Sequence, residues 1–460
     1  MNERDDDLEV NQKAELFERT PVPKAVFTLA VPMVISSLVM VLYNLADTYF
    51  VGMLNDPIQN AAVTLAAPVL LAFNAVINLF GTGCSSMMGR ALGRKDYDTV
   101  RRTSAFGFYC SVLAGILFTM VCTTFAEPLI RMLGADEITY AVTYDYMKWT
   151  VMCGAAPAIL NVVLSSMIRS EGSSFHASIG TMSGCVLNII LDPVFILPWG
   201  LNMGAAGAGC ATFLSNCFAF LYYMVLIWIK RGSTFVSISP KWFSLNRDIV
   251  TGVCTVGIPA AIQNLLNVTG MTILNNFTAG FGADAVAAMG IAYKLYMIPI
   301  QVQWGCSIGI MPLISYNYGS GNYKRMKESI LYAIKVLIPA MTVMMIFYYI
   351  GAGPMIGAFM KNEAIITYGT WFLRGFCLGM PFMCMDFLGV NVFQSLGKGK
   401  VAFVFAILRK IVLEIPLLFV LNVLFPLYGL AYAQATAEMV LAIAAVVMLR
   451  RMFLKTGNGI

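Results

Sequence analysis

The sequence predicts an all-α polytopic membrane protein with twelve transmembrane helices in two six-helix bundles, which a parallel pseudo-two-fold repeat relates. Three observations predict this fold. The 460 residues are 59% hydrophobic and 12% charged, whereas soluble domains average about 25% charged residues. Twelve apolar runs are long enough to cross a bilayer. The second half of the chain also repeats the pattern of the first.

The twelve runs follow from the length that a bilayer demands, about 20 predominantly apolar residues for each helix. In chain order they occupy residues 26–50, 60–84, 104–126, 141–167, 176–197, 205–229, 250–279, 286–312, 330–351, 365–390, 402–424 and 428–449. The predicted domains are a tail (1–24), an N-terminal lobe (25–230), a linker (231–249), a C-terminal lobe (250–450) and a second tail (451–460).

Lysine and arginine are distributed unevenly over the loops between these runs. Twenty-two lie in the tails and in every second loop, whereas the remaining loops contain only Arg131 and Lys361. Cytoplasmic loops carry the excess of positive charge in membrane proteins. We therefore expect a multi-pass protein of the cell membrane with both termini in the cytoplasm. The net charge of +6 then reflects orientation and gives no support for nucleic-acid binding.

Several kinds of chemistry are excluded by residues that the sequence lacks. Its single histidine, His176, cannot build a His-based metal cage or a Ser-His-Asp triad. The phosphate-binding pattern G-x-x-x-x-G-K-[ST] and the metalloprotease pattern H-E-x-x-H are both absent. We expect no enzyme activity and no cofactor, and any uphill transport has to use an ion gradient.

The internal repeat appears when the chain is compared with itself at a shift of about 226 residues. Pro32 then corresponds to Pro259, Gly83 to Gly309, and "RSEG" at 169–172 to "QSLG" at 394–397. Six helices are an even number, so both halves enter the membrane in the same direction. Parallel repeats of this kind occur in transporters in which two bundles move about a central cleft.

Two acidic residues in predicted membrane helices point to function. Asp47 and Asp192 each cost about 2.5–3.5 kcal/mol to place at the bilayer centre even on a lenient scale. Asn188 lies four residues before Asp192, on the same helix face, and Pro193 leaves the carbonyl of Ile189 without its helical hydrogen bond. Such groups either bind a transported ion or hold a structural contact between helices.

Longer motifs resemble those of the multidrug and toxic compound extrusion (MATE) transporters, and the DinF-like branch more than the NorM-like one. The motifs are "AVPMVISSLVMVLYNLADTYFVG" from Ala30, "GRALGRKDYDTVRR" from Gly89, "RSEG" and "VLNIILDPVFI" from Val186. The resemblance covers nearly the whole chain through the order of these motifs.

The resemblance implies a site for the coupling ion in the N-terminal lobe. The matching positions are Asp47, Asn188, Asp192 and Thr212, with Tyr43 one turn before Asp47 and Pro32 as a candidate hinge. Two carboxylates, an amide and a hydroxyl suit a hard cation such as Na+, or alternatively a shared proton. We expect H+ or Na+ at this site.

The C-terminal lobe has a different polar set, which we expect to face the substrate. Its members are Gln263, Asn264, Asn267, Lys294, Asp386 and Glu414. Asn267 falls where NorM-like proteins have a glutamate, so Asp386 lacks that acidic partner. We expect Lys294 to satisfy a buried carboxylate here, either Asp386 or Glu414, and Asp386 to tune substrate binding.

These observations predict a secondary active antiporter that exports amphipathic or cationic organic compounds in exchange for H+ or Na+ by alternating access. The partners would be a small organic substrate and membrane lipid, with a monomer as the functional unit. The alternative is a lipid-linked oligosaccharide flippase of a related superfamily. That function predicts more helices and a strongly basic central cavity.

Overall fold

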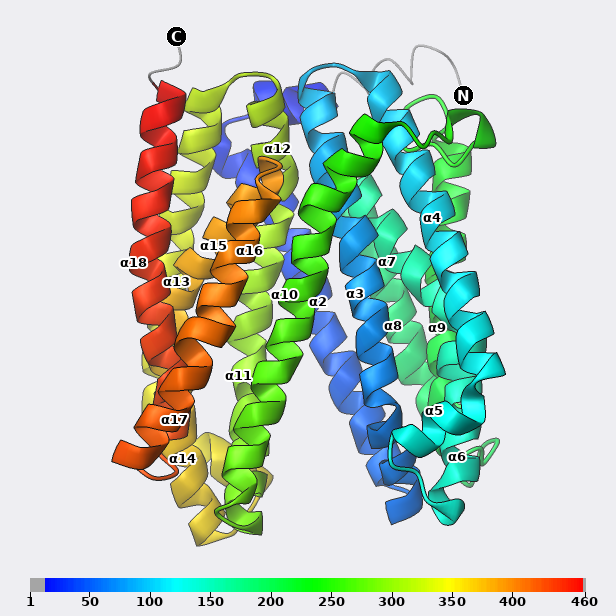
Figure 1. Cartoon of the computed structure of the whole chain (residues 1–460), viewed down its shortest axis with the longest axis vertical. Coiled ribbons are helices and arrows are strands. Elements are labelled where there is room, and N and C mark those ends of the chain that lie inside the picture. Colours follow the sequence, from blue (N-terminus) through cyan, green and yellow to red (C-terminus); the bar gives the residue numbers. More distant parts are fainter. Residues whose placement is uncertain (1–12, 458–460) are drawn as a thin grey trace.

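The computed structural model describes residues 13–457, and within that range the chain forms helices and no β-strand. Figure 1 shows two helical bundles side by side. The first contains α2 (Val22–Gly52), α3 (Pro57–Gly93), α4 (Tyr97–Thr124), α5 (Ala126–Met132), α6 (Glu137–Met147), a π-helical turn η1 (Lys148–Cys153), α7 (Ala155–Ser170), α8 (Ser174–Ile196) and α9 (Ala205–Ile229). We call it the N-lobe.

The second bundle, the C-lobe, follows a connection that contains the short helix η2 (Pro240–Trp242). Its helices are α10 (Arg247–Ala279), α11 (Ala283–Gly309), α12 (Met311–Gly319), α13 (Tyr323–Phe359), α14 (Glu363–Leu378), α15 (Met380–Ser395), α16 (Gly399–Ile407), a π-helical η3 (Leu408–Glu414), α17 (Ile415–Leu424) and α18 (Gly429–Gly457).

Each of the twelve predicted segments coincides with a helix or with consecutive helices, although several helices extend further, for example α3 to Gly93 and α13 to Phe359. Eight described helices are individually long and apolar enough to cross a membrane, and two bent pairs raise the number to ten. The remaining two segments are α16–η3–α17 and α18. Large apolar side chains such as Leu113, Ile190 and Val343 are exposed on the outside of the bundles. The predicted fold of a membrane protein is therefore confirmed.

The internal repeat also appears in the shapes of the helices. In the N-lobe, α6–η1 and α7 are bent by 46° at Gly154; in the C-lobe, α14 and α15 are bent by 48° at Gly379. These two bends lie at matching positions of the repeat. The paired glycines Gly83 and Gly309 also have matching surroundings, because each lies against the backbone of the other lobe.

The lobes meet along α3 against α10 and along α2 against α11. A Cβ atom added to Gly83 would lie 2.6 Å from the carbonyl oxygen of Val253, and one added to Gly309 would lie 2.7 Å from Cα of Ala30. Ser86 donates a 2.5 Å hydrogen bond to the carbonyl of Gln394 in the other lobe. A single apolar core takes residues from both lobes in this region. The Lys/Arg-rich loops lie at the same end, the upper one in Figure 1, which we call the charged end.

A short segment before α2, residues 13–20, connects the two lobes at the charged end. Lys13 forms a 2.9 Å ion pair with Glu171 of the N-lobe. Phe17 is 2% exposed and stacks on Tyr316 of the C-lobe with ring centroids 4.6 Å apart. Arg325 donates to the carbonyl oxygen of Phe17 at 2.6 Å. We refer to residues 13–20 as the N-terminal strap.

Candidate functional site

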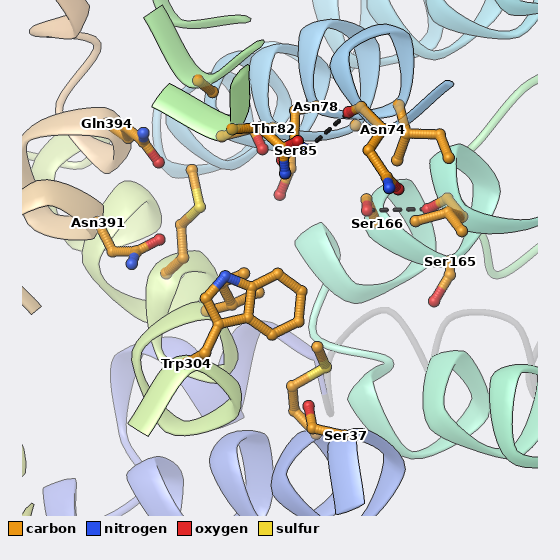
Figure 2. Close-up of a pocket in the computed structure, with 18 of the residues that line it drawn as sticks. Ser37, Asn74, Asn78, Thr82, Ser85, Ser165, Ser166, Trp304, Asn391 and Gln394 are labelled. Atoms are coloured by element: carbon orange, nitrogen blue, oxygen red, sulfur yellow. Dashed lines mark hydrogen bonds between the residues drawn. The ribbon is translucent and has the colours of Figure 1, made fainter. Parts of the chain in front are cut away.

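A cavity of about 410 Å³ lies between the two lobes. Helices α2, α3, α7 and α8 line it from one side, and α10, α11, α12 and α15 from the other. Figure 2 shows the indole of Trp304 between Asn391 and Gln394 on one side and Ser165 and Ser166 on the other. The wall thus combines amide and hydroxyl groups with an aromatic ring and several methionines, as expected for a binding site of an amphipathic molecule.

Three of the six predicted substrate residues contribute to this wall, and three do not. Gln263, Asn264 and Asn267 line the cavity from α10. Lys294 is exposed on α11, and Asp386 and Glu414 are buried inside the C-lobe; these three are not among the lining residues. The three α10 residues thus lie at the cavity and the three charged residues lie elsewhere, and a role of any of them in substrate binding stays a prediction.

The predicted coupling residues of the N-lobe come together where α8 meets α9. Asn188 and Asp192 are 1% and 0% exposed. The side-chain amide of Asn188 bridges α8 and α9. Its nitrogen donates to both carboxylate oxygens of Asp192, one turn further along α8, at 2.9 and 3.2 Å. Its oxygen accepts from the hydroxyl and the backbone N–H of Thr212 on α9 at 3.2 and 3.0 Å. This orientation satisfies the donors and acceptors on both sides. Asn188 therefore fixes Asp192 relative to Thr212.

Asp47 and Tyr43 enter the same cluster from α2. The hydroxyl groups of Tyr43 and Thr212 are 3.5 Å apart. Asp47 interacts electrostatically with Asp192, and its buried Oδ1 has no hydrogen-bond partner. A buried carboxylate oxygen without a donor is costly, so this position favours either a bound proton or a bound cation. Tyr146, which the sequence did not single out, faces both acids from α6.

The cluster is connected to the cavity wall by neutral amides. Asn216 donates to the backbone carbonyl of Thr212 at 2.9 Å, and Asn161 on α7 donates to the side-chain oxygen of Asn216 at 2.9 Å. The next residue on α7, Val162, lines the cavity. The coupling cluster therefore lies inside the N-lobe, outside the cavity, and a short chain of hydrogen bonds joins it to a helix of the cavity wall.

A second group of charged residues is buried in the C-lobe, and it corrects the predicted partner of Asp386. Arg409 is 5% exposed and lies 2.6 Å from Glu438 and 3.2 Å from Asp386. The next residue, Lys410, pairs with Glu414 at 2.6 Å. Lys294 is thus the partner of neither acid, because Arg409 and Lys410 occupy that role. No local pattern in the sequence connects Glu438 with Asp386, because the two residues lie on different helices.

Pro32, the predicted hinge, lies inside α2 without interrupting it. Proline has no N–H to donate, so the carbonyl of Thr28 lacks its usual partner on the next turn. The helix is continuous from Val22 to Gly52 in this conformation.

The matches to known proteins agree with this architecture. A family model described as MatE matches residues 32–194 and 259–420, one range in each lobe. The chain belongs to the MATE family. It is a multi-pass membrane transporter and not an enzyme, as the resemblance implied. Among curated relatives, it is 33% identical over 434 residues to the "Multidrug export protein MepA" of Staphylococcus aureus strain MRSA252, with 94% of each chain covered. The protein of the same name from Staphylococcus saprophyticus is also 33% identical over 434 residues, again with 94% of each chain covered.

Solved MATE structures share the complete fold. One described as an outward-facing conformation of a multidrug resistance MATE family transporter has a TM-score of 0.91 at 27% identity, covering 96% of this chain and 98% of the other. A MATE structure in complex with MaL6 has a TM-score of 0.90 at 26% identity and covers 96% of this chain and 99% of the other. The two-lobe arrangement is therefore the MATE fold over nearly its full length.

Proposed function

We propose that this protein is a secondary active antiporter that exports amphipathic organic compounds in exchange for H+ or Na+. The observation that carries the proposal is the interacting pair of the half-buried Asp47 and the buried Asp192. Asn188 holds Asp192, and the pair lies in the N-lobe behind a cavity between the two lobes. Two acids that interact inside an apolar lobe favour binding of a proton or cation. Export of organic compounds is supported by the similarity to proteins named multidrug export protein.

The placement of the contacts between the lobes supports alternating access. The Ser86–Gln394 hydrogen bond and the close approach of Gly83 to Val253 close the charged end. By the positive-inside rule, this end faces the cytoplasm, and both ends of the described chain lie there. We propose that the structure is closed toward the cytoplasm, which matches its similarity to a transporter described as outward-facing. Each chain contains both lobes and its own cavity, so we propose a monomer in the cell membrane, surrounded by lipid.

The flippase alternative would need a strongly basic central cavity. In the described part of the chain, only one cationic side chain, Arg169, lines this cavity. Arg409 and Lys410 are buried elsewhere, and each is paired with an acid. These observations favour a small organic substrate over a lipid-linked oligosaccharide.

The test uses purified protein in vesicles loaded with a fluorescent dye, with a proton gradient or a sodium gradient imposed separately. One gradient should drive efflux, and Asp47→Asn and Asp192→Asn should each abolish the driven part because the pair can no longer bind and release the ion. Asp284→Asn is the matched control, since Asp284 is an exposed acid in the first turn of α11. Driven efflux at the wild-type rate in Asp47→Asn would show that the proposed site is wrong.

A further inference from the structure

The charge of the cavity wall is unusual for an exporter of cationic compounds. Among the described residues that line it, Arg169 is the only charged side chain, and no aspartate or glutamate lines the cavity. The remaining polar groups are hydroxyls and amides, which include Asn74, Asn78 and Gln301. The acids of both lobes lie behind the wall. A cationic ligand in this cavity would meet a guanidinium and no carboxylate.

Arg169 has no ion-pair partner in the described chain. It is 7% exposed; its Nη2 donates to the hydroxyl of Ser165 at 3.1 Å, and its buried Nε makes no hydrogen bond. The hydroxyl of Tyr223 is near but neutral. A buried cation without a countercharge destabilises the protein by several kcal/mol, so the site favours an anionic group that enters from the cavity.

The acid closest in sequence is bound elsewhere. Glu171 accepts hydrogen bonds from Lys13 of the N-terminal strap at 2.9 Å, from the hydroxyl of Thr234 at 3.0 Å and from the backbone N–H of Phe235 at 2.9 Å. These bonds hold Glu171 toward the charged end. Arg169 instead follows the direction of helical side chains, which lean toward the preceding turn, and this brings it to Ser165 and the cavity.

The fold itself does not require an arginine at this place. The repeat aligns Arg169 of "RSEG" with Gln394 of "QSLG", and Gln394 lines the same cavity from the other lobe. One lobe thus places a neutral amide where the other places a cation. The cation is therefore a feature of the N-lobe wall alone, and the repeat does not account for it.

We infer that the cavity takes amphipathic organic compounds that carry an anionic group, such as a carboxylate or sulfonate, and that Arg169 binds this group. This inference rests on the proposed export function and narrows its substrate class. The apolar body of the compound would lie against Trp304 and Met40, while Ser165 and Ser166 are placed beside the anionic end. A cavity of about 410 Å³ falls in the range of sites that bind drug-sized molecules.

The test compares two dyes that differ by one negative charge: a xanthene dye with a free carboxylate and its ethyl ester. Fluorescence anisotropy of the full chain in detergent, without any gradient, gives the two dissociation constants. A charge-assisted hydrogen bond changes affinity by roughly tenfold to a hundredfold. We expect the wild type to bind the acid at least tenfold more tightly than the ester, a comparison that needs no variant.

The variant Arg169→Gln, which copies the residue of the C-lobe, should bring the ratio of the two dissociation constants close to one. Arg169→Lys should retain part of the preference, and the exposed Arg131→Gln should retain all of it. Equal binding of both dyes by the wild type, or an unchanged ratio in a folded Arg169→Gln, would overturn the inference. Gradient-driven export of the ester with no preference for the acid would leave the export function standing while refuting this substrate class. Binding of the acid through Arg169 without driven export in vesicles would support this ligand class and refute the export function.

Discussion

Removing Arg409 should destabilise the C-lobe strongly, because two carboxylates depend on it. Its guanidinium lies 2.6 Å from Glu438 and 3.2 Å from Asp386, and the three side chains are 5%, 0% and 1% exposed. Removal of one partner of a buried ion pair costs about 3–5 kcal/mol, since the other charge stays buried without a partner. We expect Arg409→Met to lower the free energy of unfolding by at least this amount.

The neutral combinations should recover stability step by step. Adding Glu438→Gln to Arg409→Met removes one unpaired charge, and adding Asp386→Asn removes the other. Replacement of a whole buried ion cluster by neutral residues is often close to neutral for stability. The triple variant should therefore be the nearest to the wild type, and the single variant should be the least stable of the three.

The assay is unfolding by sodium dodecyl sulfate in mixed micelles, followed by far-ultraviolet circular dichroism. A double-mutant cycle of Arg409 and Glu438 gives the coupling free energy between the two side chains. The control is a cycle of Arg131 and Glu127, a 3.2 Å pair whose side chains are 56% and 63% exposed. There we expect a coupling free energy of about 1 kcal/mol or less. A coupling between Arg409 and Glu438 as small as that of the exposed pair would refute the reasoning, because it would mean that water reaches both groups.

Three further perturbations test the topology, the coupling cluster and the strap. In Lys361→Cys the thiol should react with a membrane-impermeant maleimide added outside the cell, and in Lys95→Cys it should react only after permeabilisation. The opposite pattern would show that the charged end faces outward. Thr212→Ala should slow driven dye efflux less than Asp47→Asn, because the Thr212 hydroxyl is neutral and contacts Asn188 and Tyr43 rather than carrying charge itself. A greater loss would make the hydroxyl essential. Phe17→Ala should loosen the contact between the lobes at the charged end, since Phe17 is 2% exposed in its stack with Tyr316 and such truncations cost about 3–5 kcal/mol. A cysteine introduced into the cavity wall should then become accessible from the charged end, whereas Phe27→Ala, at an exposed side chain, should leave it protected.

Much of the fold and part of the site could be predicted because their signals are local. Twelve apolar runs give the helices directly, and the repeat gives the pairing of Gly83 with Gly309. Asn188 and Asp192 share a helix face through their spacing alone. These signals need no knowledge of how one helix is rotated against another.

The partners of the buried charges depended on such rotations and were therefore missed. Lys294 lies in the correct stretch of α11 but on an exposed face, while Arg409, Asp386 and Glu438 come from three separate helices. The apolar run that ends at residue 167 places Arg169 among the cations of the following loop. In the structure α7 continues to Ser170, and a long side chain in a last helical turn leans back over the turn before it.

At the charged end the two lobes approach each other through helix backbone at Gly83 and Gly309. A water molecule needs a space of roughly 10–15 Å³, and a contact this close leaves no such space between the two helices. Exposed side chains change rotamer within picoseconds to nanoseconds, whereas a helical backbone keeps its hydrogen bonds on that timescale. A seal of this kind limits the leak of protons and small ions past the open cavity. Because each elementary charge that crosses the membrane dissipates about 2.3 kcal/mol per 100 mV, a tight backbone seal lets ions cross only when the lobes change conformation.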